Sequence, residues 1–293
     1  MRVATWNVNS LAARVPRVVP WLEQRRPDVV CLQETKLDDA GFTAAIGTEL
    51  ESLGYEWAHH GQGQWNGVAL LSRVGLDDVE KAFADTPGFP DPADAPEARA
   101  VSAVCGGVRV YSLYVPNGRE VGSDHYEYKL TWLAALRESV LAAGPSSTMV
   151  CGDINIAPTD DDVYNPEAFA GHTHVTDAER AALTALVDTG LADVVRERWP
   201  DERVFSYWDY RAGMFHKDLG MRIDLVLAGS DVASRVAAAF IDRQARKGSK
   251  PSDHAPVIVD LDDAPDGDIG PMVPPPSNPA KRSGAGKPPQ SSA

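Results

Sequence analysis

Short apolar runs rich in β-branched residues recur along the chain, and they constrain the fold more than any other feature. Runs of this length, bounded by Gly, Pro, Asn and Asp, are typical of buried strands. They occupy residues 3–8, 29–32, 68–71, 108–115, 149–151, 223–228 and 257–259. The sequence therefore predicts a sheet-based core in which polar segments connect the strands.

Helical patterns separate several of these runs. Residues 126–141 carry apolar side chains at helical spacing, which predicts an amphipathic helix. A further helix is predicted to begin near Arg17, because Pro16 and Pro20 fit only a first turn or the segment that leads into it. Since strands and helices alternate and no short repeat is present, we expect a layered α/β fold.

The composition changes after Asp260. Residues 261–293 consist largely of Pro, Gly, Ser, Ala and Asp, so that segment has little apolar surface to bury. We therefore predict one domain over residues 1–260, followed by a disordered Pro/Gly/Ser-rich tail over residues 261–293. A domain of this length is compatible with folds that pack two sheets around one core.

The sequence contains no apolar run long enough for a signal peptide near Met1 or for a membrane span elsewhere. We accordingly expect a cytoplasmic protein that does not enter a membrane. Its three cysteines, Cys31, Cys105 and Cys151, are odd in number and lack the spacing of metal ligands. Each lies in or beside an apolar run, so we expect reduced thiols in the core.

The formal net charge of −14 argues against a protein that coats nucleic acid, because neutralising phosphates requires a clustered excess of Lys and Arg. It does not exclude a metal-dependent site, which itself needs several carboxylates. Basic residues do gather near the end of the domain, at Lys217, Arg222, Arg243, Arg246, Lys247 and Lys250. An anion-binding patch and a solvated loop remain equally open interpretations of this group.

Polar segments able to bind a metal ion adjoin the apolar runs. They are Trp6-Asn7-Val8-Asn9, Leu32-Gln33-Glu34-Thr35-Lys36, Tyr114-Val115-Pro116-Asn117-Gly118, Gly152-Asp153-Ile154-Asn155 and Ser252-Asp253-His254. Loops at the ends of strands commonly carry functional residues. Any one of these segments by itself is also compatible with an ordinary turn.

Four carboxylates stand in or beside apolar runs, namely Glu34, Asp153, Asp224 and Asp253. A buried carboxylate is costly unless it is paired or coordinates a cation, so these groups require partners. A shared cation satisfies several of them at once. Because the donors are Asp, Glu and Asn oxygens, without cysteines or a histidine pair at helical spacing, the sequence favours Mg²⁺, or Mn²⁺ as a substitute, over zinc.

In this order, the segments resemble the exonuclease III and AP endonuclease branch of the endonuclease/exonuclease/phosphatase superfamily. The shared motifs are W-N-x-N, L-Q-E-T-K, Y-x-P-N-G, G-D-x-N, R-I-D and S-D-H-A-P, and the resemblance extends from Met1 to about Asp260. Residues 33–36 and 252–256 resemble the DNA repair nucleases more than the lipid phosphodiesterases and inositol phosphatases. The resemblance implies a four-layered α/β sandwich of two packed, mostly antiparallel sheets flanked by helices, with the polar segments meeting at one edge.

The resemblance also implies a role for each motif residue. Glu34 would be the main Mg²⁺ ligand, with Asn7 and Asp253 beside it, and the ion would neutralise the phosphate and stabilise the leaving oxygen. Asp153 would handle the proton of the attacking water or of the leaving group, and Asn155 would hold the pentacovalent phosphorane by hydrogen bonding.

His254 would contact the phosphate or accept a proton, while Asp224 would fix its tautomer and orientation. His254, or Asp153 with Asn155, would also be able to reach a second metal ion, so one-metal and two-metal chemistry both remain open. Tyr114 would hydrogen-bond the scissile phosphate through its hydroxyl; the alternative for this residue is an ordinary strand aromatic.

A second set of residues would contact DNA by the same resemblance. It comprises Lys36, Arg99, Arg119, Tyr207, Trp208, Met221, Arg222 and Ile223. The basic members are candidates for contacts to flanking phosphates, whereas the aromatic and apolar members would receive a flipped-out, base-free sugar. The remaining conspicuous histidines, His59, His60, His172 and His174, are interpreted as surface groups.

The function implied is a Mg²⁺-dependent DNA repair nuclease that acts as a monomer on double-stranded and abasic-site DNA. It would remove nucleotides from 3′ ends and cut 5′ to an abasic site. Two alternatives stay open. One is another phosphodiesterase of the same superfamily that acts on RNA, lipid or a small phosphoester, and the other is a DNA-binding protein that has lost catalysis.

Overall fold

Two sheets form the frame of the computed structural model, which describes residues 1–276. The seven-stranded sheet has the order β13-β11-β12-β1-β2-β4-β3, and the six-stranded sheet has the order β5-β6-β7-β8-β10-β9. The strands are β1 Arg2–Asn7, β2 Val29–Gln33, β3 Glu56–His60, β4 Val68–Ser72, β5 Asp77–Lys81, β6 Ala100–Cys105, β7 Val108–Tyr114, β8 Thr148–Asp153, β9 Leu191–Asp193, β10 Asp224–Gly229, β11 Val236–Asp242, β12 Val257–Leu261 and β13 Met272–Val273. Three neighbouring pairs are parallel, β1 with β2, β7 with β8 and β11 with β13, and the others are antiparallel. The prediction of mostly antiparallel sheets is confirmed.

The two sheets pack face to face around an inner layer of core side chains. Their inward residues are small or β-branched, such as Val29 and Val110, so the sheets approach closely. Cys31, Cys105 and Cys151 all lie in this layer as buried free thiols. The prediction of reduced core cysteines is therefore confirmed.

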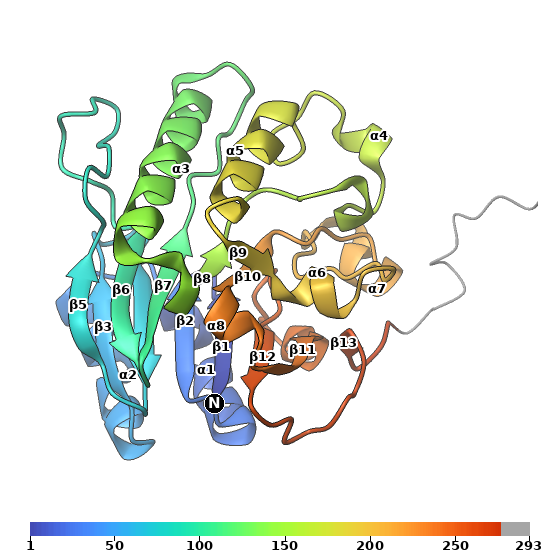
Figure 1. The fold of residues 1–293 in the computed structure, drawn as a ribbon. Coiled ribbons are helices and arrows are strands. Elements are labelled where there is room, and N and C mark those ends of the chain that lie inside the picture. The colour runs from blue at the N-terminus through green and yellow to red at the C-terminus, as the bar shows by residue number, and fades with distance from the viewer. Residues whose placement is uncertain (277–293) are drawn as a thin grey trace, which may run out of the picture.

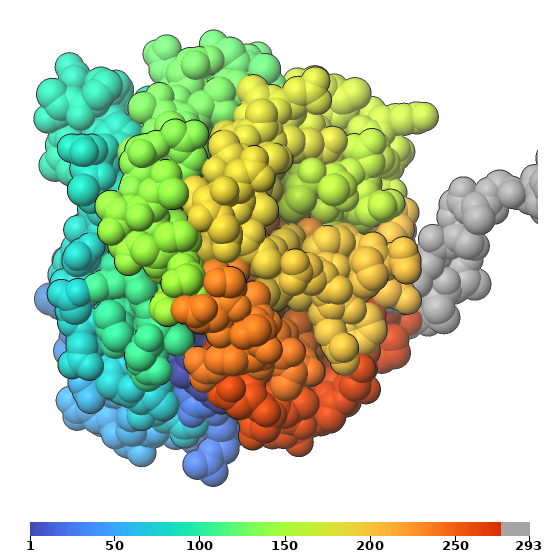
Figure 2. Space-filling model, viewed as in Figure 1, coloured from blue at the N-terminus to red at the C-terminus, as the bar shows by residue number. Residues whose placement is uncertain are grey.

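Helices form the two outer layers, which confirms the predicted four-layered sandwich. The α-helices of the described residues are α1 Leu11–Arg25, α2 Asp39–Ser52, α3 Asp124–Ala143, α4 Pro166–Phe169, α5 Asp177–Val187, α6 Val194–Arg198, α7 Met214–Lys217 and α8 Ser230–Ala233, and the outer layers consist of α1 and α2 on one side and α3 and α5 on the other. Trp21 and Phe42 from α1 and α2 pack on the outer face of the seven-stranded sheet. Trp132 and Leu186 from α3 and α5 pack on the six-stranded sheet. Figure 1 shows α3 and α5 side by side over this sheet, and Figure 2 shows that their side chains cover it.

The helix predicted near Arg17 begins earlier, at Leu11, and Pro16 and Pro20 lie inside it. Proline removes a backbone donor, which leaves a carbonyl one turn earlier without its helical partner. Both prolines lie on the exposed face of α1, where water can satisfy those carbonyls. The helix therefore tolerates them, and its buried face still contributes Val18 and Leu22 to the core.

The boundary predicted at residue 260 is too early. β12 continues to Leu261, and β13 pairs in parallel with β11, where Met272 is only 2% exposed. Arg2 fastens the intervening segment, because its guanidinium donates to Asp260 at 2.7 Å and to Asp266 at 2.8 Å. The predicted disorder is thus corrected for residues 261–276, and residues 277–293 lie outside the described part of the chain.

Among residues 1–276, no helix combines the length and apolar character needed to cross a membrane. The longest helix, α3, instead has one face on the six-stranded sheet and carries charged residues elsewhere.

The interpretation of His59 as a surface group is wrong, because its ring is buried at the contact between β3 and α2. It stacks on Phe42 with ring centroids 4.3 Å apart. Nε2 lies 2.8 Å from Thr35 Oγ1, and Nδ1 lies 2.8 Å from Asp39 Oδ1. Burial lowers the pKa of His59 to about 4, against the opposing effect of Asp39.

We predict that His59 makes the stability of the fold depend on pH. Its pKa in the folded chain lies below the ordinary value, so its contribution is fully present above pH 6.5 and is lost as the pH falls toward about 4. Within that window the free energy of unfolding should fall by about 1.4 kcal/mol per pH unit. Urea unfolding of the wild type and of His59→Gln across this range measures the effect, and a pH-independent difference between them would contradict it.

Candidate active site

The polar strand ends meet at one edge of the two-sheet frame. Asn7 ends β1 and Glu34 follows β2, and these strands are parallel neighbours in the seven-stranded sheet. Tyr114 and Asp153 end the parallel pair β7 and β8 in the other sheet. Asp224 begins β10 directly opposite Asp153, because β10 runs antiparallel to β8. The segments that the sequence predicts to converge therefore do so.

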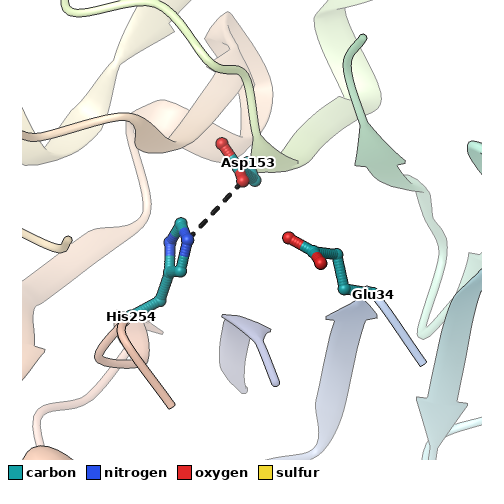
Figure 3. Close-up of side chains that lie close together, drawn as sticks. All are labelled: Glu34, Asp153 and His254. Carbon is teal, nitrogen blue, oxygen red and sulfur yellow. Dashed lines mark ion pairs between the residues drawn. The ribbon is translucent and has the colours of Figure 1, made fainter. Parts of the chain in front are cut away.

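Glu34, Asp153 and His254 point toward one another in the space between the strand ends (Figure 3). One ligand atom from each lies within 4.8 Å of the other two. The buried amide of Asn7 holds the two carboxylates, because Nδ2 donates to Glu34 Oε1 at 2.8 Å and to Asp153 Oδ2 at 2.9 Å. Asn7 thus links Glu34, which follows a strand of the seven-stranded sheet, to Asp153, which ends a strand of the six-stranded sheet.

His254 is oriented by a carboxylate on its far side. Its Nδ1 lies 2.8 Å from Asp224 Oδ2, and its Nε2 lies 3.8 Å from Asp153 Oδ2. The Ser206 hydroxyl donates to the same Asp224 oxygen at 2.6 Å. Burial acts to lower the pKa of His254, but the charge and hydrogen bond of Asp224 outweigh it and raise the pKa to about 10. Nε2 is therefore aimed at the group of acids as a hydrogen-bond donor.

The two carboxylates of the group differ in their affinity for a proton. Burial, together with the charges of Asp224 and Glu34, raises the pKa of Asp153 to about 7, although His254 opposes the shift. Burial also acts to raise the pKa of Glu34, but the Lys36 ammonium 2.8 Å away outweighs it and lowers the pKa. Glu34 is suited to holding a cation, whereas Asp153 is suited to exchanging a proton near neutral pH.

The backbone at the site is strained. Glu34, Lys36 and Asn155 have φ angles of 53°, 53° and 55°, in the left-handed region that side chains other than glycine rarely adopt. The surrounding hydrogen bonds hold these conformations; the Ser10 N–H, for example, donates to the Glu34 carbonyl at 2.8 Å. Such outliers cluster at functional sites, where the fold over-determines them.

The donor set fits a divalent cation, since Glu34 and Asp153 offer two carboxylate oxygens to one point beside His254. Other predicted ligands already accept hydrogen bonds from the protein. Among them, Asn7 Oδ1 accepts from the Asn9 backbone at 3.0 Å, and Asp253 Oδ1 accepts from Asn9 Nδ2 at 3.1 Å.

Asn155 is likewise held by the protein, since its Oδ1 accepts from Asn117 at 3.3 Å and its Nδ2 donates to the Val115 carbonyl at 3.0 Å. Lys36, a predicted phosphate contact, sits at the rim and donates to Asn9 Oδ1 at 2.6 Å. Both side chains border the group of acids without forming part of it.

One cleft of about 480 Å³, named the Arg99 cleft, reaches the site at Tyr114. Arg99 lies over the Tyr114 ring, 5.0 Å from its centroid, and Arg119 is an exposed member of the wall. Burial, and next the Glu34 carboxylate, raise the pKa of Tyr114 well above its ordinary value. The phenol therefore keeps its proton and can donate it in a hydrogen bond.

A second cleft of about 350 Å³, named the Met221 cleft, is lined by Tyr207, Met221 and mainly apolar neighbours. Tyr207 lies between this cleft and His254, because the centroids of the two rings are 4.9 Å apart. Two other residues predicted for this pocket are not available to a ligand. Trp208 is fully buried against Phe215, and Ile223 is 2% exposed behind the wall. Their side chains support the cleft, so the predicted DNA contacts are corrected for both.

Arg222 is also corrected, because its guanidinium is 1% exposed and cannot reach a phosphate. It donates to Asp162 at 2.6 Å and to Asp193 at 2.7 Å. The sequence motif places this arginine two residues before Asp224, but the ion pairs with Asp162 and Asp193 hold its side chain away from the site.

The predicted basic group near the end of the domain also contains buried arginines beside exposed lysines. Arg243 and Arg246 are buried, and their guanidinium carbons lie 4.5 and 4.8 Å from the Phe215 ring centroid. Lys247 and Lys250 remain exposed. The group therefore contributes chiefly to packing, and only its lysines belong to the solvated loop.

Sequence reasoning missed the role of Ser206. Its hydroxyl donates to Asp224. The Ser206 Oγ also accepts from the backbone N–H groups of Ile223 and Asp224, at 3.3 and 3.1 Å. A lone serine between aromatic residues carries no signal of such a role. The bridge between Tyr207 and His254, with the hydrogen bond from the Ala255 N–H to the Ser206 carbonyl at 2.7 Å, brings it beneath His254.

We predict that Arg222→Met destabilises the fold instead of merely weakening DNA binding. The change leaves Asp162 with Arg196 as its remaining partner and removes the guanidinium from Asp193, and breaking a buried ion pair in this way costs about 3–5 kcal/mol. Urea unfolding measures the loss, and Arg119→Ala is the control, since an exposed arginine should change stability by less than about 0.5 kcal/mol. Near-normal stability with weakened DNA binding would restore Arg222 to the DNA interface.

Comparisons with known proteins agree with this geometry. Residues 4–254 match the Endonuclease/Exonuclease/phosphatase family. Exodeoxyribonuclease III of Haemophilus influenzae is 31% identical over 275 residues, which cover 89% of this chain and 100% of that protein. The solved structure of an AP endonuclease from Archaeoglobus fulgidus has a TM-score of 0.83 and 33% identity, over 90% of this chain and 100% of its own. That of a 3′-5′ exonuclease from Neisseria meningitidis has a TM-score of 0.83 and 38% identity, over 89% and 100%. The resemblance found in the motifs is confirmed, and the chain belongs to the endonuclease/exonuclease/phosphatase family, in the branch similar to exodeoxyribonuclease III.

Proposed function

We propose that this protein is a divalent-metal-dependent DNA repair nuclease that cuts double-stranded DNA 5′ to an abasic site and removes nucleotides from 3′ ends. The observation that carries the proposal is the group of Glu34, Asp153 and His254 at the edge where the two sheets meet. Two carboxylates and an imidazole around one point are suited to metal-assisted hydrolysis of a phosphodiester. The similarity to an AP endonuclease, a 3′-5′ exonuclease and exodeoxyribonuclease III supports DNA as the substrate.

The cation in this proposal is Mg²⁺, with Mn²⁺ as a substitute, held chiefly by Glu34 with Asp153 beside it. When bound, the ion neutralises the phosphate and stabilises the leaving oxygen. Magnesium prefers oxygen ligands and keeps several of its waters, which suits a site built from carboxylates. Asn7 keeps both carboxylates within reach of one ion, since its Nδ2 donates to each of them.

The side chains around the phosphate have separate roles in proton transfer and hydrogen bonding. The oxygen of a water forms the new bond to phosphorus, and its proton passes to Asp153. The bond from phosphorus to the 3′ oxygen breaks, and that oxygen takes up a proton from solvent to become the 3′-hydroxyl. His254, held at Nδ1 by Asp224, directs Nε2 toward the phosphate oxygens. Tyr114 and Asn155 donate hydrogen bonds to the same phosphate as its charge develops.

The substrate strand in this proposal lies across both clefts. The Arg99 cleft offers two guanidinium groups for phosphates next to Tyr114, and the Met221 cleft offers an apolar pocket next to Tyr207. Local positive charge of this kind positions a backbone even when the whole chain is acidic. On the family resemblance, we propose that the protein acts as a monomer.

We predict that Asp153→Asn abolishes cleavage while the fold is retained. The variant keeps the shape of the side chain but loses its ability to take a proton, so kcat should fall roughly 10²- to 10⁴-fold. A labelled duplex with one abasic site, incubated with Mg²⁺ or with EDTA, reports incision and 3′ shortening together. Asp161→Asn, the same change at an exposed acid, is the matched control and should remain active.

Wild-type protein that leaves this duplex intact in Mg²⁺ while cleaving RNA or a small phosphodiester would replace the DNA substrate with the alternative phosphodiesterase activity. Metal-independent binding of the duplex without turnover would instead indicate a DNA-binding protein that has lost catalysis.

We further predict that Asp224→Asn lowers kcat by about 10- to 100-fold, because the carboxylate that orients His254 is replaced by an amide. Ser206→Ala removes only the hydroxyl that donates to Asp224, so its effect should have the same direction and be smaller. Thermal unfolding of both variants separates this loss from a loss of fold. Full activity of folded Asp224→Asn would show that His254 needs no carboxylate support.

A further inference from the structure

The Met221 cleft is lined by a histidine whose Nε2 receives no hydrogen bond from the part of the chain that the structure describes. Its walls include Tyr164, Phe169 and Leu219, which are largely apolar. Two charged members, Asp209 and Arg211, are paired with each other at 2.7 Å. The remaining polar wall residue besides Tyr207 is His174, which the sequence indicates as a surface group.

His174 is instead built into the wall at three points. Its backbone N–H donates to Glu179 Oε1 at 3.0 Å, and its carbonyl accepts from the Ala157 N–H at 2.8 Å. Its side chain Nδ1 lies 2.5 Å from the Asn155 carbonyl oxygen. Its φ of 82° is left-handed, which costs energy unless the surroundings impose it. The ring is therefore held in one orientation next to the catalytic strand end.

The hydrogen-bond partners determine which nitrogen of His174 carries the proton. A carbonyl oxygen can only accept, so Nδ1 must be the donor to Asn155. Lys129 Nζ donates to the same carbonyl at 2.7 Å and places a positive charge beside the ring. The ammonium beside the ring disfavours a second positive charge there, so the ring is neutral and carries its single proton on Nδ1.

In a neutral ring with the proton on Nδ1, Nε2 is an acceptor with a free lone pair. Within residues 1–276, no protein group donates to His174 Nε2, and the residue lines the cleft. An acceptor held rigidly in an otherwise apolar pocket selects for a ligand that brings a hydroxyl or an N–H.

The Met221 cleft contains Tyr207 and Met221, which the family resemblance assigns to the pocket for a base-free sugar, and we propose that His174 Nε2 accepts a hydrogen bond from the C1′ hydroxyl of that sugar. This inference rests on the proposed abasic-site activity. The C1′ hydroxyl of a ring-closed abasic deoxyribose occupies the position of the lost base, and an intact nucleotide has no such donor. His174 is in this case a specificity-determining residue that distinguishes an abasic site from an undamaged one.

The test compares two abasic duplexes of identical sequence. One carries the natural site, made by removing a uracil, and the other carries a tetrahydrofuran analogue that lacks the C1′ hydroxyl. For His174→Leu, kcat/KM on the natural site should fall roughly 3- to 10-fold, as expected for one lost hydrogen bond, while that on the analogue stays within about twofold. Leu219→Ala, a change in an apolar wall of the same cleft, should alter both substrates equally.

His174→Gln is the second variant, in case the leucine disturbs the anchor at Asn155. A glutamine offers both a donor and an acceptor, so it should recover part of the preference for the natural site. An equal loss on both substrates for the two His174 variants would assign a purely structural role and overturn the inference. Wild-type protein that cuts neither substrate would instead overturn the proposed function, and the inference with it.

Discussion

The contact on which the site depends is the pair of hydrogen bonds from the Asn7 amide to Glu34 and Asp153. Two carboxylates this close repel each other, and burial strengthens the repulsion because little water screens it. A donor between them lowers that cost only if the two sheets stand at the right separation. That separation is set by the inner core layer, where Cys31 and Cys151 are among the compact side chains that let the sheets approach. The packing of the core therefore also sets the geometry of the site.

Buried charges elsewhere in the fold are also held by partners. The chain is acidic, yet several of its basic side chains are used inside the fold. Lys129 pairs with Glu179 at 2.5 Å between α3 and α5, with both side chains fully buried, and Arg222 pairs with Asp162 at 2.6 Å. Removing one partner from such a pair is costly, so these contacts keep the loops around the site in place. The Lys129 pair reaches Asn155 directly, since Nζ also donates to its carbonyl.

Much of the fold follows from local sequence. Every apolar run predicted as a strand corresponds to one, because a buried strand requires a continuous run of β-branched and apolar residues. Two of the strands that sequence patterns miss lack that signal. β5, Asp77–Lys81, is exposed along its whole length, and β11, Val236–Asp242, is rich in alanine. Both exist because a neighbouring strand offers a free edge, which is a property of the assembled sheet and not of the segment.

For the site, the sequence by itself determined which residue types were available and that they stand at strand ends, and the motifs placed Glu34, Asp153 and His254 among a larger set of predicted ligands. Only the tertiary structure decided which side chains face that group. Arg222 and Trp208 stand within or beside motif residues but point into the core, while His174, outside every motif, lines the Met221 cleft. Direction depends on the register of β10 against β8 and on ion pairs between residues far apart in the chain. These are long-range relations, which no local pattern encodes.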